Sequence, residues 1–323
     1  MTGAAVLLHG ARDLRFGSVP PEDLVPGRVR VAVRGVGLCG SDLHYFADGR
    51  NGATVVTAPT VLGHEGFGVI TEGERAGQRV AIEPAAPCLR CPVCLAGHYN
   101  VCPDHTCLGS PPAHGLLRES VVVPAQFAHP LPPAVSDEVA PLIEPLAVAT
   151  WALRRGGPVA GRRVLVTGAG PIGLLVLQAA RAQGAADVVV TDVSPQRLAA
   201  AGALGATTGE PGPCDVAFDC SGAPAAIRTA AAALVPGGTL VLVGVPGEPA
   251  PAFPLQLLQR QELDVRGCFR YGPGAFATAI ALAASGQVDL AALVTARFPF
   301  AEAVTALTTA LTDRAQLKVL IDF

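Results

Sequence analysis

Val-Leu-Val-Thr-Gly-Ala-Gly-Pro-Ile-Gly, residues 164–173, is the stretch of sequence that decides the fold. Its first four residues are apolar or β-branched, as expected of a buried strand, and a helix-like run, 173–183, follows the glycines. When a strand, a glycine-rich turn and a helix follow one another in this order, the small residues of the turn let the backbone approach a pyrophosphate. The N-terminus of the helix then stabilises the negative charge of the pyrophosphate. The residues predicted to bind a dinucleotide here are Gly168, Gly170, Pro171, Ile172 and Gly173.

A second apolar run, 187–192, ends in Asp192, 19 residues after the last glycine of the turn. A carboxylate at this place accepts hydrogen bonds from ribose hydroxyls and repels a 2′-phosphate, so NAD is favoured over NADP. Arg197 lies close by and weakens that preference. The alternative is a turn without a ligand, in which Asp192 caps a helix. Further residues assigned to the cofactor site, at the ends of later predicted strands, are Val243, Val245 and Phe269.

The alternation of strands and helices after residue 162 predicts an α/β domain with a doubly wound parallel sheet. The predicted strands are 164–167, 187–192, 215–219, 239–245 and 263–269, and the predicted helices are 173–183, 195–204, 223–234 and 254–260. The first 150 residues differ, because short Val-rich runs separated by turns predict an irregular β-barrel. The tail predicts helices at 275–285 and 301–312 and a final strand at 318–323.

Length and composition are those of a globular protein with about two domains. The 323 residues are 50% apolar and 15% charged, and the net charge is −3, so neither a nucleic-acid partner nor a membrane surface is expected.

Two uncharged stretches, 164–180 and 229–247, contain glycine and proline, so we interpret them as strand–turn–helix units and not as membrane spans. Without a signal peptide we expect a cytoplasmic protein. Lys318 is the single lysine, which we attribute to a composition bias.

Four cysteines at x2, x2 and x7 spacing lie in a segment, 84–110, that has little periodicity of its own. Thiolates at this spacing can surround a zinc ion, and four protein ligands make a structural site that stabilises a lobe without a core. The alternatives are an iron–sulfur cluster and reduced free thiols. The predicted ligands are Cys88, Cys91, Cys94 and Cys102. We expect Cys107 to be a spare thiol, and Cys214, Cys220 and Cys268 to be small core residues.

Three other segments carry residues suited to a second metal site. Residues 39–45 contain a thiol, a hydroxyl, a carboxylate, an imidazole and a phenol, His64 and Glu65 are adjacent, and Glu144 is an isolated acid in an apolar stretch. Each has an ordinary structural explanation: Cys39 as a core thiol, His64 and Glu65 as a surface pair, and Glu144 as a helix cap. Their combination favours a catalytic metal site.

The sequence resembles the zinc-containing medium-chain dehydrogenase/reductase family, and within it the polyol dehydrogenase branch, over nearly the whole chain. The segments that carry the resemblance are CGSDLHYFADGR (39–50), LGHEGFG (62–68), the cysteine lobe, EPLAVA (144–149), GAGPIG (168–173), VVVTDVSPQRL (188–198) and RGCFRY (266–271). It implies a GroES-like catalytic domain (1–150), a Rossmann domain (151–271), a C-terminal return to the catalytic domain (272–323) and an active site in the cleft between the domains.

The resemblance also implies which residues bind the catalytic zinc. Cys39 and His64 match zinc ligands of the family, and either Glu65 or Glu144 is expected to bind at a time, a choice that stays open. Asp42 is expected to orient His64 or to cap a turn.

Proton transfer and substrate contacts are implied in the same way. Ser41 and His44 match a relay that carries the proton to solvent, and a water handed on by Glu144 is the alternative. The residues that match polyol-contacting positions are Tyr45, Arg270 and Tyr271, of which Tyr271 has the alternative of an interface residue.

The resulting expectation is an NAD-dependent oxidation of a secondary hydroxyl to a ketone, with zinc lowering the pKa of the hydroxyl. Within the branch, the C-terminal half is most similar to L-idonate 5-dehydrogenases. The first alternative is a sorbitol, xylitol, cyclitol or aminocyclitol substrate. Two further alternatives are a metal-free enone or quinone reductase and an inactive NAD-binding sensor.

A homo-oligomer, dimer or tetramer, is expected from the resemblance alone. Residues 205–215 are shorter than in relatives and predict the loss of one helix.

Overall fold

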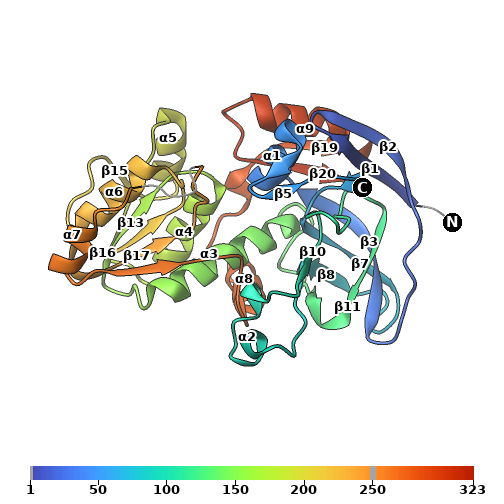
Figure 1. The fold of residues 1–323 in the computed structure, drawn as a ribbon, viewed down its shortest axis with the longest axis horizontal. Helices are drawn as coiled ribbons and strands as arrows, with labels where there is room; N and C mark the ends of the chain where they lie inside the picture. Colours follow the sequence, from blue (N-terminus) through green and yellow to red (C-terminus); the bar gives the residue numbers. More distant parts are fainter. Residues whose placement is uncertain (1–2, 248–251) are drawn as a thin grey trace. The chain divides into compact units, whose positions relative to one another are not determined.

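The computed structural model describes residues 3–247 and 252–323, which divide into two compact units (Figure 1). Unit 1 comprises Met1–Glu144 and Leu290–Phe323, and unit 2 comprises Pro145–Asp289. The boundaries predicted from sequence, after residues 150 and 271, therefore differ from those observed. Residues 272–289 stay with unit 2 because helix α8 (Ala275–Ala284) packs there. Thr150 Oγ1 donates to the carbonyl of Ala275 at 3.3 Å, and the rings of Tyr271 and Phe276 lie 4.9 Å apart.

Unit 1 is built on a seven-stranded sheet with the order β12–β8–β7–β3–β20–β19, and β11 also pairs with β3. Strand β3 shows why these residues form a sheet: Val29, Val31 and Val33 alternate with more exposed residues, mostly arginines, and are at most 2% exposed. The strand bounds are β3 (Arg28–Gly37), β7 (Glu65–Glu72), β8 (Arg79–Ile82), β11 (Ser120–Pro124), β12 (Ala128–Pro130), β19 (Val294–Pro299) and β20 (Lys318–Asp322).

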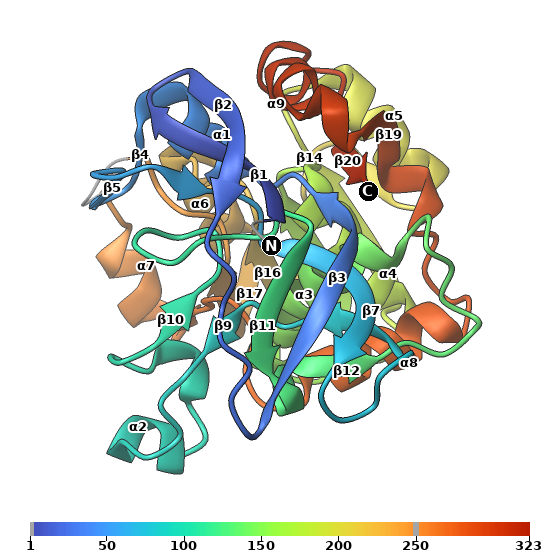
Figure 2. The ribbon, with the colours of Figure 1, turned by 90° about the vertical axis from the view of Figure 1, so that its right-hand side faces the viewer.

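The end of the chain completes this sheet, because β20 pairs antiparallel with β3 (Figure 2). A separate three-stranded sheet joins β1 (Gly3–Gly10), β2 (Asp13–Val19) and β6 (Thr60–Val61). The helices of unit 1 are α1 (Gly40–Asp48), α2 (Pro92–Leu95) and α9 (Ala303–Thr312), and its small two-stranded pairs are β4 (Arg50–Asn51) with β5 (Thr54–Val55), and β9 (Ala85–Ala86) with β10 (Thr106–Cys107). One hydrophobic core joins both larger sheets to α1 and α9.

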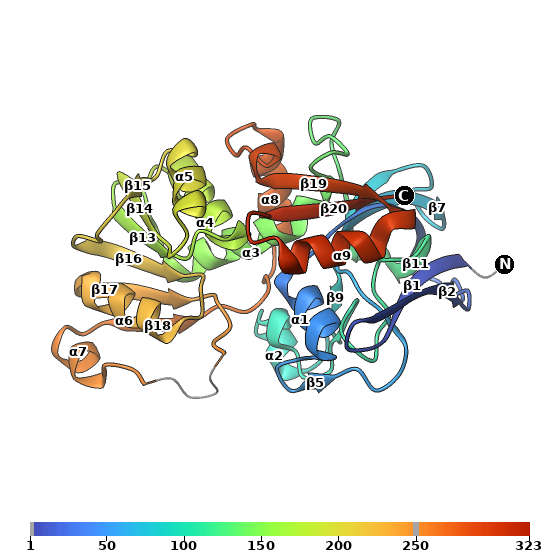
Figure 3. The same ribbon diagram turned by 90° about the horizontal axis from the view of Figure 1, so that it is seen from above.

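Unit 2 is a six-stranded parallel sheet with the order β15–β14–β13–β16–β17–β18. Helices α4 and α5 cover one face and α6 covers the other, which confirms the predicted doubly wound α/β fold (Figure 3). The strands are β13 (Arg163–Thr167), β14 (Asp187–Thr191), β15 (Thr207–Thr208), β16 (Cys214–Asp219), β17 (Leu234–Leu242) and β18 (Asp264–Gly267). The helices are α3 (Ile143–Gly156), which begins in unit 1, α4 (Pro171–Ala182), α5 (Pro195–Ala203), α6 (Pro224–Ala233), α7 (Leu255–Arg260) and α8.

The order of these strands predicts where unit 2 would bind a ligand. The chain runs outward from β13 to β14 and β15, then returns to the other side of β13 with β16. Open sheets of this kind bind ligands at the carboxyl ends of the strands on either side of such a reversal. Residues 209–213, which connect β15 to β16, contain no helix, so the sequence-based expectation of a missing helix is met. This shortening lies at the β15 edge of the sheet, away from the turn after β13.

Candidate functional site

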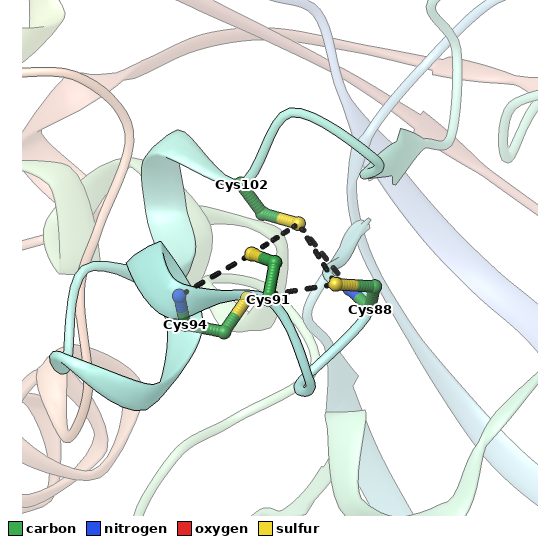
Figure 4. A group of neighbouring side chains, drawn as sticks. All are labelled: Cys88, Cys91, Cys94 and Cys102. Atoms are coloured by element: carbon green, nitrogen blue, oxygen red, sulfur yellow. Dashed lines mark hydrogen bonds between the residues drawn. The ribbon is translucent and has the colours of Figure 1, made fainter.

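The four clustered cysteines bring their sulfur atoms together in the lobe that leaves unit 1 between β9 and β10 (Figure 4). Their ligand atoms all lie within 4.8 Å of one another. The Sγ separations are 4.0 Å for Cys88 and Cys94, 3.9 Å for Cys91 and Cys102, and 3.5 Å for Cys88 and Cys102. A tetrahedron of Zn–S bonds of about 2.3 Å requires sulfur atoms about 3.8 Å apart. The four thiols therefore fit a zinc ion with no remaining open position.

Backbone N–H groups donate hydrogen bonds to sulfurs of this group and favour the thiolate form of Cys88. Cys91 precedes α2 and its Sγ accepts from the N–H of Cys94 at 3.4 Å, while Cys102 Sγ accepts from the N–H of Cys88 at 3.4 Å. The backbone N–H groups of Arg90 and Cys91 lower the pKa of Cys88 to about 6. The pKa of Cys94 moves the other way, to about 12, because burial and the thiols of Cys91 and Cys102 disfavour its charged form. Only the thiolate binds zinc, so Cys88 is the member of the group that is prepared to bind near neutral pH.

A buried carboxylate joins the cysteine lobe to the barrel. Glu83, which follows β8, is 3% exposed; it accepts a hydrogen bond from the hydroxyl of Tyr99 in the lobe at 2.8 Å and contacts His129 Nε2 on β12 at 2.6 Å. The ring of Tyr99 also meets that of Phe127 edge-to-face at 6.4 Å. Burial and the nearby charge of Glu83 raise the pKa of Tyr99, so its hydroxyl remains a donor. Sequence reasoning missed this group, because its members have no characteristic spacing.

A second group of potential metal ligands lies within unit 1. Cys39, His64 and Glu65 offer ligand atoms within 4.8 Å of one another, although 25 residues separate the first two in the sequence. Cys39 stands immediately before α1, where its backbone is extended, and His64 precedes the first residue of β7. A thiolate, an imidazole and a carboxylate at this separation fit a zinc ion, and a three-residue protein set leaves a position open to another ligand.

Asp42 holds the two segments of this site in register. Its side chain is fully buried; Oδ2 accepts from the N–H of Cys39 at 3.0 Å, and Oδ1 accepts from the N–H of Gly63 at 3.0 Å. The same Oδ1 lies 3.6 Å from Nδ1 of His64. Burial disfavours the charged carboxylate, but His64 and these N–H groups outweigh it and lower the pKa of Asp42. This geometry supports the prediction that Asp42 orients His64.

The two acids predicted as alternative metal ligands have different surroundings. Glu65 is 1% exposed, and both its carboxylate oxygens accept hydrogen bonds from Lys318. Glu144 lies at the start of α3 and is 7% exposed. Burial raises the pKa of Glu144 to about 7, with a further contribution from the charge of Glu65, while His64 and Lys318 act in the opposite direction. Sequence reasoning missed Lys318, whose contact with Glu65 spans 253 residues.

The predicted relay residues lie on α1, which follows Cys39. Ser41 is half-buried, whereas the His44 side chain is 67% exposed, with Nδ1 3.7 Å from the Asp48 carboxylate. Tyr45 is 4% exposed and its hydroxyl lies 3.1 Å from Ser110 Oγ. His44 is thus open to solvent, as the outer end of a proton relay requires, while Tyr45 belongs to the core of unit 1.

The predicted substrate contacts on unit 2 differ in environment. Tyr271 is 1% exposed and packs edge-to-face on Phe276, so its ring contributes to packing in unit 2. Arg270 adopts a left-handed φ of 53°, its guanidinium lies 4.7 Å from the ring centre of Phe269, and its Nη1 is buried without a hydrogen-bond partner among the described residues. A buried guanidinium N–H of this kind can donate a hydrogen bond to an anionic or hydroxylated ligand.

The glycine turn after β13 has the geometry that its motif predicts. Gly168 has a φ of 95°, and its N–H donates to the carbonyl of Thr191 at 2.8 Å. A Cβ atom on Gly173 would overlap the carbonyl oxygen of Gly168, whereas a Cβ on Gly170 would meet nothing within 4 Å. Pro171 and Ile172 begin α4 directly behind the turn. The backbone at Gly170 is therefore open to a ligand, while Gly173 lets α4 pack closely on the strand.

Asp192 lies beside this turn, as expected, and also has a structural contact with it. Its Oδ2 accepts from the N–H of Ala169 at 2.7 Å, and its Oδ1 accepts from the N–H of Ser194 at 2.8 Å. Arg197 is on the first turn of α5, where its N–H donates to Ser194 Oγ at 3.4 Å. Both carboxylate oxygens of Asp192 therefore accept hydrogen bonds from backbone N–H groups, and one of these bonds fixes the glycine turn.

Further residues around the carboxyl ends of these strands complete the candidate dinucleotide site. Val245, after β17, is 79% exposed, and Phe269, after β18, is 49% exposed, while Val243 is half-buried. Asp219, at the end of β16, is fully buried and accepts from Thr167 Oγ1 at 2.8 Å and Ser221 Oγ at 2.7 Å. Sequence reasoning did not assign Asp219 to the site, although it orders the loop beside the glycine turn.

Two protein-family models match the sequence, one within each unit. Residues 25–133 match the alcohol dehydrogenase GroES-like domain, and residues 171–285 match the zinc-binding dehydrogenase domain. The chain belongs to the zinc-binding dehydrogenase family, which confirms the family predicted from sequence and makes the protein a dehydrogenase. None of the described helices has the length and apolar character needed to cross a membrane.

Individual relatives place the chain close to polyol enzymes. It is 39% identical over 330 residues to sorbitol dehydrogenase of Mus musculus, covering 95% of this chain and 92% of the relative. L-Idonate 5-dehydrogenase of Escherichia coli K-12 superposes with a TM-score of 0.94 at 32% identity, covering 100% of this chain and 99% of the other. A short chain alcohol dehydrogenase of E. coli CFT073, complexed with NADH, gives 0.92 at 30% identity and the same coverage.

Proposed function

We propose that this dehydrogenase oxidises a secondary hydroxyl of a polyol or sugar acid to a ketone and transfers the hydride to NAD. The observation that carries the proposal is the convergence of Cys39, His64 and Glu65 within 4.8 Å, in a chain that also has a glycine turn followed by an acid. A bound zinc ion supplies a Lewis acid that makes an alcohol more acidic. The similarity to sorbitol and L-idonate dehydrogenases supports the substrate class.

The residues of the chain have separate tasks in this proposal. Cys39 and His64 hold the metal, and Asp42 keeps both in position through its hydrogen bonds to the backbone at Cys39 and Gly63. The Ser41 hydroxyl would accept the proton of the substrate hydroxyl while it passes its own proton on through the ribose hydroxyls of the cofactor, and the exposed His44 would take up that proton and release it to solvent.

The cofactor is held by backbone and carboxylate groups of unit 2. The open backbone at Gly170 and the N-terminus of α4 receive the pyrophosphate, and Asp192 receives the adenosine ribose. The NADH complex of the similar E. coli dehydrogenase supports a nicotinamide cofactor. A carboxylate at residue 192 supports NAD over NADP, because it would repel a 2′-phosphate.

Within this substrate class we propose an aldonate of the L-idonate type, held by Arg270. The buried, unpartnered Nη1 of this residue supports a ligand with a carboxylate, to which a guanidinium can donate two hydrogen bonds. A sugar alcohol such as sorbitol or xylitol, which lacks the charge, is the alternative.

The test is NADH formation with L-idonate, gluconate, sorbitol and xylitol, each measured with and without a chelator. The proposal expects turnover of at least one of these, loss of turnover with chelator and its return with zinc. Cys39→Ser should abolish turnover, whereas Cys107→Ser, a thiol outside the candidate site, should retain it. Turnover that survives both the chelator and Cys39→Ser would refute the proposal.

We further propose that the protein is a cytoplasmic homo-oligomer. Four thiols grouped with the geometry of a metal site, and not spaced as disulfide pairs, support a reducing compartment. The edge strand β18 supports association, because its residues are largely exposed and include Val265, which is 37% exposed. Sedimentation velocity tests the assembly, and a monomer at micromolar concentration would refute it.

A further inference from the structure

Asp219 is a fully buried acid at the point where the chain leaves β16, and four neutral donors surround its carboxylate. Oδ1 accepts from Thr167 Oγ1 at 2.8 Å, from Ser221 Oγ at 2.7 Å and from the N–H of Ser221 at 3.3 Å, and Oδ2 accepts from the N–H of Gly222 at 3.0 Å. The carboxylate therefore joins the end of β13 to the loop that follows β16.

The backbone around Asp219 extends this link to β17. The carbonyl of Asp219 accepts from the N–H groups of Val243 and Gly244, each at 2.8 Å. On the other side, the N–H of Cys220 donates to the carbonyl of Thr167 at 2.8 Å. Because β13 and β17 are the two neighbours of β16 in the sheet, this one position connects the carboxyl ends of three adjacent strands.

The loops after these three strands touch one another through glycines. A Cβ atom on Gly168, in the turn after β13, would lie 3.0 Å from the backbone nitrogen of Ser221. A Cβ on Gly244, after β17, would lie 2.2 Å from the nitrogen of Gly222, and a Cβ on Gly222 would lie 2.3 Å from the carbonyl oxygen of Val245. Since close-packed backbone transmits displacement, a shift of one loop would displace the other two.

The dinucleotide proposed for unit 2 has to reach across these loops. Asp192, after β14, is assigned to the adenosine ribose, and the turn after β13 is assigned to the pyrophosphate. The nicotinamide half then extends to the other side of β13, where β16 and β17 end. Val243 and Val245, which were predicted to contact the cofactor, belong to the loop after β17. The nicotinamide half therefore depends on loops that Asp219 fixes relative to the glycine turn.

We propose that Asp219 is a positioning residue that holds the loops after β16 and β17 in register with the glycine turn, so that the nicotinamide half of NAD meets a preformed surface. The inference rests on the proposed function. Asp219 makes no contact with the cofactor in this account; it acts through Thr167, Ser221 and Gly222. A preformed surface binds more tightly because less conformational freedom is lost on binding. Loss of the carboxylate should weaken a ligand that contains the nicotinamide half and spare one that lacks it.

The experiment titrates the full-length protein with NADH by fluorescence and with AMP by calorimetry. Asp219→Asn keeps the size of the side chain but replaces one acceptor oxygen with an amide donor. It should weaken NADH binding by at least about tenfold and AMP binding by less than about threefold. Thr167→Val removes a single bond to the carboxylate and should weaken NADH binding by about threefold or more. Thr167→Ser keeps the hydroxyl and should bind NADH as the parent does.

Asp215→Asn is the matched control. Asp215 also links β16 to β13, because it accepts from the N–H of Arg163 at 2.8 Å, but it does so at the amino ends of these strands. Its substitution should leave both affinities within about twofold of the parent values.

Unchanged NADH binding in Asp219→Asn would overturn the inference. An equal loss of NADH and AMP binding would also overturn it, because that result would indicate general distortion of unit 2. If Asp219→Asn does not fold, the comparison of Thr167→Val with Thr167→Ser decides, and equal NADH affinity in these two variants would contradict the proposed link. Failure of the proposed function is a different result, since the parent itself would then bind no NADH.

Discussion

The substitutions Gly173→Ala and Gly170→Ala should separate two roles of the glycine turn, which are close packing of α4 on the sheet and binding of the cofactor. At Gly173 the new Cβ overlaps the backbone oxygen of Gly168, which cannot move without displacing β13 from α4. Overpacking of this kind costs about 1–3 kcal/mol, and a clash with backbone belongs at the upper end, so we expect a loss of about 3 kcal/mol in the free energy of unfolding.

Gly170 is the matched position, because its φ of −73° suits alanine and its Cβ would meet nothing within 4 Å. Gly170→Ala should leave the free energy of unfolding within about 0.5 kcal/mol of the parent. Its methyl group would occupy the space where the pyrophosphate approaches, so NADH binding should weaken by at least about tenfold, or about 1.4 kcal/mol.

Urea unfolding followed by circular dichroism measures the first effect, and titration of NADH fluorescence measures the second. The reasoning is refuted if Gly173→Ala unfolds like the parent, because α4 would then not depend on close packing at the turn. It is equally refuted if Gly170→Ala binds NADH as tightly as the parent, because the pyrophosphate would then lie elsewhere.

Three further predictions concern single side chains. Cys91→Ser should remove one equivalent of zinc and expose the lobe to proteolysis, while Cys107→Ser should change neither; an unchanged zinc content would exclude a structural metal there. Asp42→Asn should lower the free energy of unfolding by about 1.5–3 kcal/mol, because an amide oxygen cannot replace both carboxylate oxygens as acceptors. Since the pKa of Asp42 is lowered in the folded protein, its stabilisation is complete above its ordinary value of 3.8 and is lost as the pH falls below it, so the variant should lose that acid dependence. Urea unfolding at several pH values checks both statements, and identical curves for parent and variant would contradict them. Asp192→Ala should weaken NAD binding far more than NADP binding in parallel titrations; an equal loss for both would mean that Asp192 acts through its contact with the glycine turn.

Features that depend on neighbouring residues could be predicted from sequence. The strand and helix around the glycine turn were expected at 164–167 and 173–183 and are observed at Arg163–Thr167 and Pro171–Ala182. The cysteine spacing predicted a four-thiol group in the same way, because ligands within 15 residues converge through local turns. Local periodicity and spacing carry this information directly.

Features that depend on distant pairings could not be predicted. The Lys318–Glu65 contact requires knowing that β20 joins the sheet two strands away from β7, and nothing near either residue indicates it. The unit boundary at Leu290 was missed for a similar reason: the 275–285 helix was recognised, but not its packing on α3 through Thr150. Which of Glu65 and Glu144 binds metal depends on such contacts, so the sequence left that choice open.

Zinc content and turnover, measured together in the parent and in Cys39→Ser, test the catalytic-metal account most directly. We expect about two zinc ions per chain in the parent and about one in the variant, with NADH formation abolished and NADH binding retained. A variant that keeps the full zinc content and still oxidises the substrate would contradict a catalytic metal held by Cys39 and His64.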